Sequence, residues 1–188
     1  MKKIYAFAIT LTFALQINSC AKSSEHEIQY SKSSSPDTSA VVTWHNFNEG
    51  IKQALAQRKP IVLDFYADWC VWCKKMEEEV FSEAQVARKL KDNFICIRIY
   101  TDKDIKETIK YKNHTLSKKE FTVMLGVQGL PTVVFMDRDA NFITKIPGYV
   151  KKDVFLPLLS YIDEECYQKK ISFNDYVDGK SPCLKNKK

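Results

Sequence analysis

The motif Cys70-Val71-Trp72-Cys73 constrains the fold of this chain more than any other feature, because of the segments on either side of it. An apolar run rich in β-forming residues precedes it at 61–66, and apolar residues at helical spacing follow it to residue 90. Cys70 is therefore expected at the start of a helix, where unpaired N–H groups and the helix dipole favour a thiolate. Cys73 would lie one turn further along on the same side. The pattern predicts a reactive pair of thiols between a buried strand and a helix.

The main alternative for such a pair is half of a structural zinc site. Structural zinc takes four ligands, commonly as two close pairs of Cys or His. The chain has no second CxxC motif, and its histidines, His26, His45 and His114, are scattered. We therefore expect no metal, and no organic cofactor either, because exchange between thiols and disulfides needs neither.

Hydrophobic periodicity over residues 43–170 predicts helices that alternate with strands. The expected helices cover residues 46–58, 73–90, a segment that starts at 117, and 152–169, and the expected strands cover 61–66, 94–100, 133–136 and 142–146. We expect Leu55 and Val154 to face inward, and a helix break near Ser82, which makes a capping-box pattern with Gln85. Alternation favours a parallel core, and the last two strands add an antiparallel edge. The predicted class is α/β, a central mixed sheet of four to five strands flanked by helices, as in the thioredoxin fold.

The segment from Asp64 to Met76 resembles the active-site segment of thioredoxin-like proteins. It is most similar to the periplasmic C-terminal domain of DsbD-type thiol:disulfide interchange proteins and to related small thioredoxin-like lipoproteins. Residues 80–86 and 129–135 are also similar to that group. The resemblance runs from about Trp44 to Cys166, so it covers most of the chain after the N-terminal segment.

The resemblance implies a role for each matching residue. Cys70 matches the attacking cysteine, and Cys73 matches the cysteine that resolves the mixed disulfide. Asp64 matches a buried acid below the pair that accepts the proton of Cys73. Pro131 matches a proline with a cis peptide bond, which would leave the backbone of Leu130 free to pair with a substrate strand.

Three further residues are expected around the groove. Trp69 matches an aromatic residue beside the pair and is expected to contact partners. Trp72 departs from the Gly-Pro dipeptide of ordinary thioredoxin, so it is expected to shield Cys73 or to shape the substrate groove, and no redox potential carries over. Gly148 matches a glycine that gives a partner room to approach.

The N-terminal 40 residues have a different composition. Residues 1–20 have the basic start and short apolar run of a signal peptide, with a lipobox-like end at Cys20. We expect Cys20 to be lipidated, with plain signal cleavage near Ser19 as the alternative. The Ser-rich segment 21–42 is expected to be a flexible tether, 43–170 the folded domain, and 171–188 a C-terminal tail.

Two other parts of the chain lie outside the family pattern. The connection 101–117 is longer than a compact domain needs, so it is expected to be either functional or an extra surface helix. Cys166 and Cys183 either form a structural disulfide, or Cys166 is a buried apolar residue and Cys183 a free thiol. Cys96 lies in a predicted strand and is expected to be inert.

The charge pattern bears on possible partners. The formal net charge is +6, but Lys and Arg form no basic stripe interleaved with aromatics, so we expect no nucleic-acid partner. The resemblance implies a monomeric thiol:disulfide oxidoreductase on the periplasmic side of the cell envelope. It would reduce or isomerise protein disulfides and receive electrons from a transmembrane donor of the DsbD type. The alternative is a redox-silent, chaperone-like module that binds peptides in the Pro131 groove.

Overall fold

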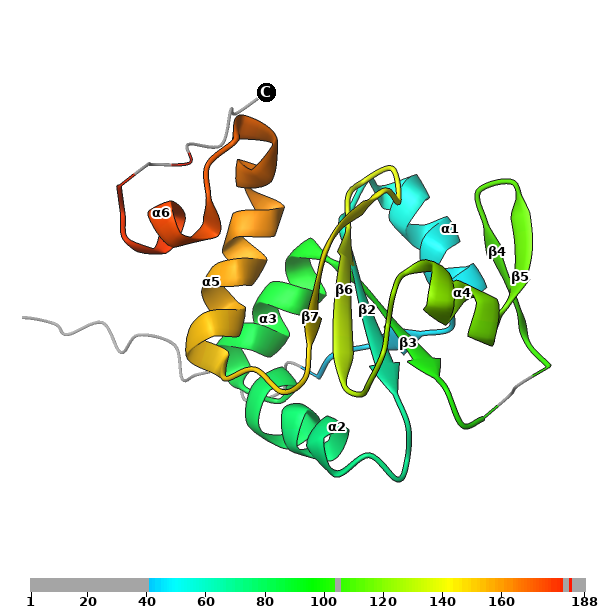
Figure 1. Ribbon diagram of the computed structural model, residues 1–188. Helices are drawn as coiled ribbons and strands as arrows, with labels where there is room; N and C mark the ends of the chain where they lie inside the picture. Colours follow the sequence, from blue (N-terminus) through cyan, green and yellow to red (C-terminus); the bar gives the residue numbers. More distant parts are fainter. Residues whose placement is uncertain (1–40, 104–105, 181–182, 184–188) are drawn as a thin grey trace, which may run out of the picture. The chain divides into compact units, whose positions relative to one another are not determined.

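The computed structural model describes residues 41–103, 106–180 and 183 (Figure 1). The expected signal peptide with Cys20, and nearly all of the expected tether, lie outside the described residues. The elements in chain order are β1 (Trp44–His45), α1 (Phe47–Gln57), β2 (Ile61–Tyr66), α2 (Val71–Met76), the π-helix η1 (Glu77–Phe81), α3 (Ala84–Asn93), β3 (Ile95–Tyr100), β4 (Thr108–Tyr111), β5 (His114–Ser117), α4 (Lys118–Met124), β6 (Thr132–Met136), β7 (Phe142–Pro147), α5 (Lys152–Asp163), the 3₁₀-helix η2 (Cys166–Lys169) and α6 (Phe173–Val177).

The main sheet has five strands in the order β1-β3-β2-β6-β7. Strand β3 runs parallel to both β1 and β2, whereas β6 runs antiparallel to β2 and to β7. The predicted mixed sheet with an antiparallel edge is therefore confirmed. In this register Asp64 on the central strand β2 faces Arg98 on β3 and Val133 on β6.

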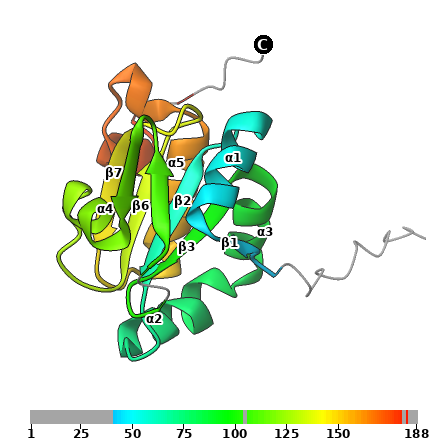
Figure 2. The same ribbon diagram turned by 90° about the vertical axis from the view of Figure 1, so that its right-hand side faces the viewer.

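Helices cover both faces of this sheet, with α1 and α4 on one face and α3 and α5 on the other (Figures 1 and 2). Side chains alternate along β2, so Ile61, Leu63 and Phe65 join the core on the α1 side, while Val62 joins the core on the α3 side. These four side chains are fully buried, and each contributes about 2 kcal/mol by leaving water. The same alternation turns Asp64 toward the face that carries α2 and α3.

Residues 108–117 of the long connection form a β-hairpin, so the prediction of an extra surface helix is wrong. Strands β4 and β5 pair antiparallel in a separate two-stranded sheet. Along β4, Ile109 and Tyr111 are buried and their neighbours are exposed, which is the alternation of a half-buried strand rather than of a helix. Tyr111 packs edge-on against Phe47 of α1 and Phe121 of α4. The hairpin therefore extends the core on the α1 side.

The last helix is shorter than expected. Helix α5 ends at Asp163, because Glu165 adopts a left-handed conformation with φ of 56°, and the 3₁₀-helix η2 follows. The segment expected to be a tail carries α6, whose N-cap Ser172 accepts from the backbone N–H of Asp175. Two exposed side chains contradict the inward orientation predicted for them, Leu55 at 47% exposure and Val154 at 46%.

Helix capping follows the sequence at one site and departs from it at another. The capping box of Ser117 and Glu120 at the start of α4 is confirmed. The box predicted for Ser82 and Gln85 is wrong, although the helix does break there. Ser82 belongs to the preceding turn, where its hydroxyl donates to the carbonyl of Glu78, and α3 begins without a side-chain cap.

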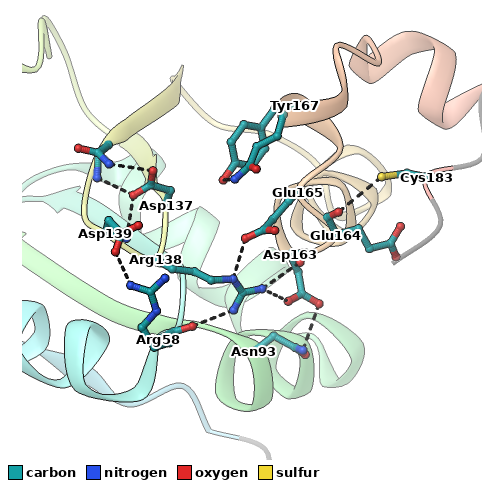
Figure 3. Close-up of polar contacts among 12 residues, drawn as sticks. Arg58, Asn93, Asp137, Arg138, Asp139, Asp163, Glu164, Glu165, Tyr167 and Cys183 are labelled. Atoms are coloured by element: carbon teal, nitrogen blue, oxygen red, sulfur yellow. Dashed lines mark hydrogen bonds and ion pairs between the residues drawn. The ribbon is translucent and has the colours of Figure 1, made fainter. Parts of the chain in front are cut away.

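A network of charged side chains joins the turn between β6 and β7 to three helices (Figure 3). Arg138 donates to the carboxylate of Glu165 at 2.8 Å and to the main-chain oxygens of Arg58 and Asp163. The buried carboxylate of Asp163 also accepts from Lys89 on α3. This network holds the edge of the sheet where β6 ends and β7 begins.

Over the described residues, no helix has the length and apolar character needed to cross a membrane.

Candidate active site

Cys70 and Cys73 are joined by a disulfide at the start of α2, with their Cα atoms 5.2 Å apart. Cys70 is the N-cap residue in an extended conformation, and its Sγ accepts from the backbone N–H of Cys73 at 3.1 Å. Helix α2 runs directly into η1, so Val71 to Phe81 form one continuous helical segment. The Cys70 sulfur lies at the N-terminus of this segment. A thiolate at Cys70 is favoured there by the N–H donor and by the helix dipole.

The surface around the disulfide is apolar and exposed, whereas the cysteines are covered. Trp69, Val71 and Trp72 are 70%, 74% and 54% exposed, while Cys70 and Cys73 are 3% and 2% exposed. Large apolar side chains left in water next to a covered reactive group are typical of a surface that meets a partner. A partner that reaches Cys70 therefore meets these exposed apolar side chains, which are its neighbours in the chain.

The segment before β6 packs against the cysteines. The Leu130–Pro131 peptide bond is cis, and Leu130 packs against the cluster formed by Ala67, Cys70 and Cys73. The carbonyl of Pro131 accepts from the backbone N–H of Gly148 at 2.8 Å, which ties this segment to the end of β7. Gly148 has a φ of 80° and open space where a Cβ would lie, so its backbone conformation alone explains the glycine.

Buried Asp64 is linked to two residues that were not predicted from the sequence, Arg98 and the partly exposed Glu77. The Arg98 Nε donates to Oδ2 of Asp64 at 2.8 Å, and Nη2 of the same guanidinium pairs with Glu77. Burial raises the pKa of Asp64 from 3.8 to about 6, and Arg98 opposes that rise. The guanidinium lies 4.1 Å from the ring centre of Trp44 and 4.7 Å from that of Tyr66. A carboxylate with this pKa exchanges protons near neutral pH.

The start of the 101–117 connection supports the loop before Cys70. The backbone N–H of Thr101 donates to the carbonyl of Tyr66 at 2.9 Å, and the backbone N–H of Asp68 donates to Asp102 at 2.8 Å. Lys103 pairs with the side chain of Asp68. The connection thus reaches the site through its first residues, and the β4–β5 hairpin itself contacts α1 and α4.

Three further cysteines are described in the structure, and none of them is bonded to Cys70 or Cys73. Cys166 and Cys183 form a second disulfide, which holds Cys183 against the end of α5. Among the described residues, the one group with the spacing of metal ligands is Glu164, Cys166 and Cys183, and two of its members are spent in this disulfide. Cys96 is a free, buried thiol, and burial raises its pKa, so it stays protonated.

The fold and the cysteine pair define a class of protein, and a comparison with family models agrees. The model of the thioredoxin-like domain matches residues 47–163, and the chain belongs to this family. A thioredoxin-fold protein from Helicobacter pylori superposes with a TM-score of 0.54 at 20% identity and covers 76% of this chain and 89% of its own. A thioredoxin from Thermus thermophilus has a TM-score of 0.51 at 20% identity, with 74% and 95% covered. At these identities the likeness shows the thioredoxin fold.

Among curated proteins, the chain is similar to the thiol:disulfide interchange protein DsbD. It is 38% identical to the protein from Yersinia enterocolitica over 110 residues, which are 56% of this chain and 17% of that protein. It is 38% identical to the protein from Escherichia coli K12 over 89 residues, 46% of this chain and 14% of that protein. The chain thus matches about one sixth of the length of these relatives. The resemblance seen in the sequence is confirmed.

Proposed function

We propose that this protein is a thiol:disulfide oxidoreductase that reduces or isomerises protein disulfides at Cys70 and Cys73. The observation that supports the proposal most directly is the disulfide at the start of a helix, with Leu130 of the cis Leu130–Pro131 bond packed against it. The similarity to DsbD, an interchange protein by name, supports the same chemistry.

The proposed reaction starts from the reduced pair. The Cys70 thiolate attacks one sulfur of a substrate disulfide, which forms a mixed disulfide and releases the other substrate sulfur as a thiolate. Cys73 then loses its proton to Asp64 and attacks the sulfur of Cys70. The Cys70–Cys73 disulfide forms and the second substrate thiol leaves, so two electrons pass to the substrate. Trp69, Trp72 and the backbone of Leu130 hold the substrate segment during both steps.

The direction of net transfer is part of the proposal. Because the similarity is to DsbD, we favour reduction or isomerisation, with a transmembrane protein of the DsbD type as the source of electrons. A reduction potential measured against glutathione tests this direction. A value of about −120 mV, at the oxidising end of the range for such proteins, contradicts the proposed direction of transfer.

The proposed location is the periplasmic side of the cell envelope. Its support is the basic, apolar and lipobox-like sequence of residues 1–20 and the Ser-rich segment that follows. Lipidation at Cys20 would tether a monomer to the membrane. Labelling of cells with a radioactive fatty acid tests this, since wild type would carry the label and Cys20→Ala would lose it.

A trapping experiment tests the reaction itself. Cys73→Ala leaves Cys70 without its resolving partner, so mixed disulfides with substrates should accumulate and collapse on addition of a reductant. The matched control is Cys70→Ala/Cys73→Ala, which should form none. If the two variants yield the same adducts, Cys70 is not the attacking residue.

A further inference from the structure

A line of contacts runs from the dipeptide between the two cysteines to the segment that holds Pro131. The Trp72 ring lies 5.7 Å from the ring of Tyr149, with the two planes tilted by 45°. Tyr149 follows Gly148, whose backbone N–H donates to the carbonyl of Pro131. Trp72, Tyr149 and the Pro131 segment therefore form one continuous wall beside the covered disulfide.

Tyr149 is fixed in this wall from two sides. Its hydroxyl donates to Oε2 of Glu79 at 2.6 Å, which anchors the ring to the helical segment after Cys73. Its backbone is held by the turn at Gly148, and Lys75 lies over both aromatic rings, 5.3 Å from the Trp72 centroid and 5.5 Å from that of Tyr149. Aromatic pairs attract each other, and a cation is attracted to the face of an aromatic ring. These contacts restrict an indole that is otherwise half exposed to water.

The chemistry of the wall selects what lies against it. The Trp72 side chain is 54% exposed and precedes Cys73 in the chain, and burying an apolar side chain against its free surface is favourable. A cationic side chain is disfavoured beside these rings, because the ammonium of Lys75 already lies near both and repels a second positive charge. A substrate with apolar residues next to its disulfide cysteine fits this site best.

We propose that Tyr149 is a positioning residue that holds Trp72 as the apolar wall of the substrate groove, and that this wall makes the protein prefer disulfides flanked by apolar residues. This inference rests on the proposed function. It adds the class of substrate and names a residue outside the cysteine pair that determines it.

A single-turnover experiment with two peptides tests the inference. Each peptide carries one intramolecular disulfide, and the two differ only in having Leu or Ser on both sides of the first cysteine. Protein with reduced Cys70 and Cys73 is mixed with excess peptide, and oxidised protein is counted by acid quenching and thiol alkylation. Wild type should oxidise about tenfold faster with the Leu peptide, since that ratio corresponds to about 1.4 kcal/mol of extra apolar burial.

Four variants separate positioning from a general structural role. Tyr149→Ala and Trp72→Ala should each reduce the Leu-to-Ser ratio to about twofold or less, because each slows the Leu peptide more than the Ser peptide. The double variant should lose no more, because both residues act through one wall. Phe142→Ala, which removes an exposed aromatic at the far end of β7, should keep the full ratio.

The following outcomes overturn the inference. If wild type reduces neither peptide, the proposed function fails and the inference fails with it. If wild type reduces both peptides at one rate, the proposed function stands but the preference for apolar flanks is contradicted. If the variants keep the tenfold ratio, the role of Trp72 and Tyr149 in that preference is contradicted. Variants that slow both peptides equally show that Tyr149 supports the fold alone. Because Trp72 is exposed, Trp72→Ala decides the question even if Tyr149→Ala fails to fold.

Discussion

Arg98 and Asp64 face each other on the parallel strands β3 and β2, and Nε of Arg98 donates to Oδ2 of Asp64 over 2.8 Å. The other end of the guanidinium pairs with Glu77 in η1. One buried cation therefore links the central strand to the helix that begins at the cysteines. Burial raises the pKa of Asp64 and Arg98 limits the rise, which leaves a carboxyl group with a pKa of about 6 in the core.

The free energy of unfolding should depend on pH through Asp64. Its folded-state pKa of about 6 lies above its ordinary value of 3.8, so the folded protein holds this proton more tightly. The stability that this group contributes is complete below about pH 3.8 and is lost as the pH rises through about 6. Asp64→Asn, which does not titrate, should therefore gain on the order of 3 kcal/mol over wild type between about pH 4 and pH 7.5. Urea unfolding of the oxidised proteins measures the difference, and a constant difference across that range would refute the assignment.

Removal of Arg98 should destabilise the protein in a pH-dependent way. Arg98→Met leaves Asp64 buried without its cation, and breaking a buried pair costs about 3 kcal/mol or more when the remaining group is charged. The loss should be largest near pH 8 and smaller near pH 5, where Asp64 is protonated. Arg98→Lys is the matched control, and it should recover part of the stability because it keeps the charge but not the two-pronged contact. Equal losses at both pH values would show that the aromatic packing of Arg98 dominates.

The second disulfide should stabilise the domain without taking part in exchange. Cys166 and Cys183 are 17 residues apart, and closing a loop of this length stabilises a protein by about 3 kcal/mol in the chain-entropy model. Cys166→Ala/Cys183→Ala should lose a comparable free energy of unfolding and keep the rate of disulfide reduction. Cys96→Ala is a control outside both disulfides. A large loss of reduction rate in the double variant would mean that this disulfide takes part in the reaction.

Lys118 should hold Lys103 and Glu107 against the domain. Its buried ammonium donates to the carbonyl of Lys103 at 2.9 Å and pairs with Glu107 at 3.0 Å. Lys118→Met should destabilise the protein by about 1 to 2 kcal/mol, because these groups lose a partner, and should speed protease cleavage after Lys103 or Lys106. The exposed neighbour Lys119 gives the control Lys119→Met, which should be cleaved at the wild-type rate. Mass spectrometry of the first fragments identifies the site of cleavage in each variant.

The central architecture was predictable because each element has a local signal. The apolar runs of β2, β3 and β6 and the capping box of Ser117 and Glu120 place the strands and α4 in order. The hairpin was missed because its alternation covers only four residues in β4, within a segment otherwise polar. Burial of α1 was misassigned at Leu55 because Gly50 and Ala54, which are small, face the sheet instead.

The candidate site was predictable where residues are close in sequence and not where the fold brings them together. The cysteine pair and Trp69 lie in one segment, whereas Arg98 reaches Asp64 only through the pairing of β2 with β3. A signal for Arg98 was present, since it is the single charged residue in an otherwise apolar strand. Glu77 stands seven positions after Cys70 and gave no signal of its own. The position of Tyr149 beside Trp72 depends on the turn at Gly148, which the sequence alone does not define.

Reduction of insulin by the purified protein, with dithiothreitol as the source of electrons, tests the central claim most directly. The rate of precipitation of the insulin B chain should rise well above the rate with dithiothreitol alone for wild type. It should fall to that background for Cys70→Ser, while Cys96→Ser should match wild type. The account is contradicted if wild type is no faster than Cys70→Ser, which is the result expected of a redox-silent peptide-binding module.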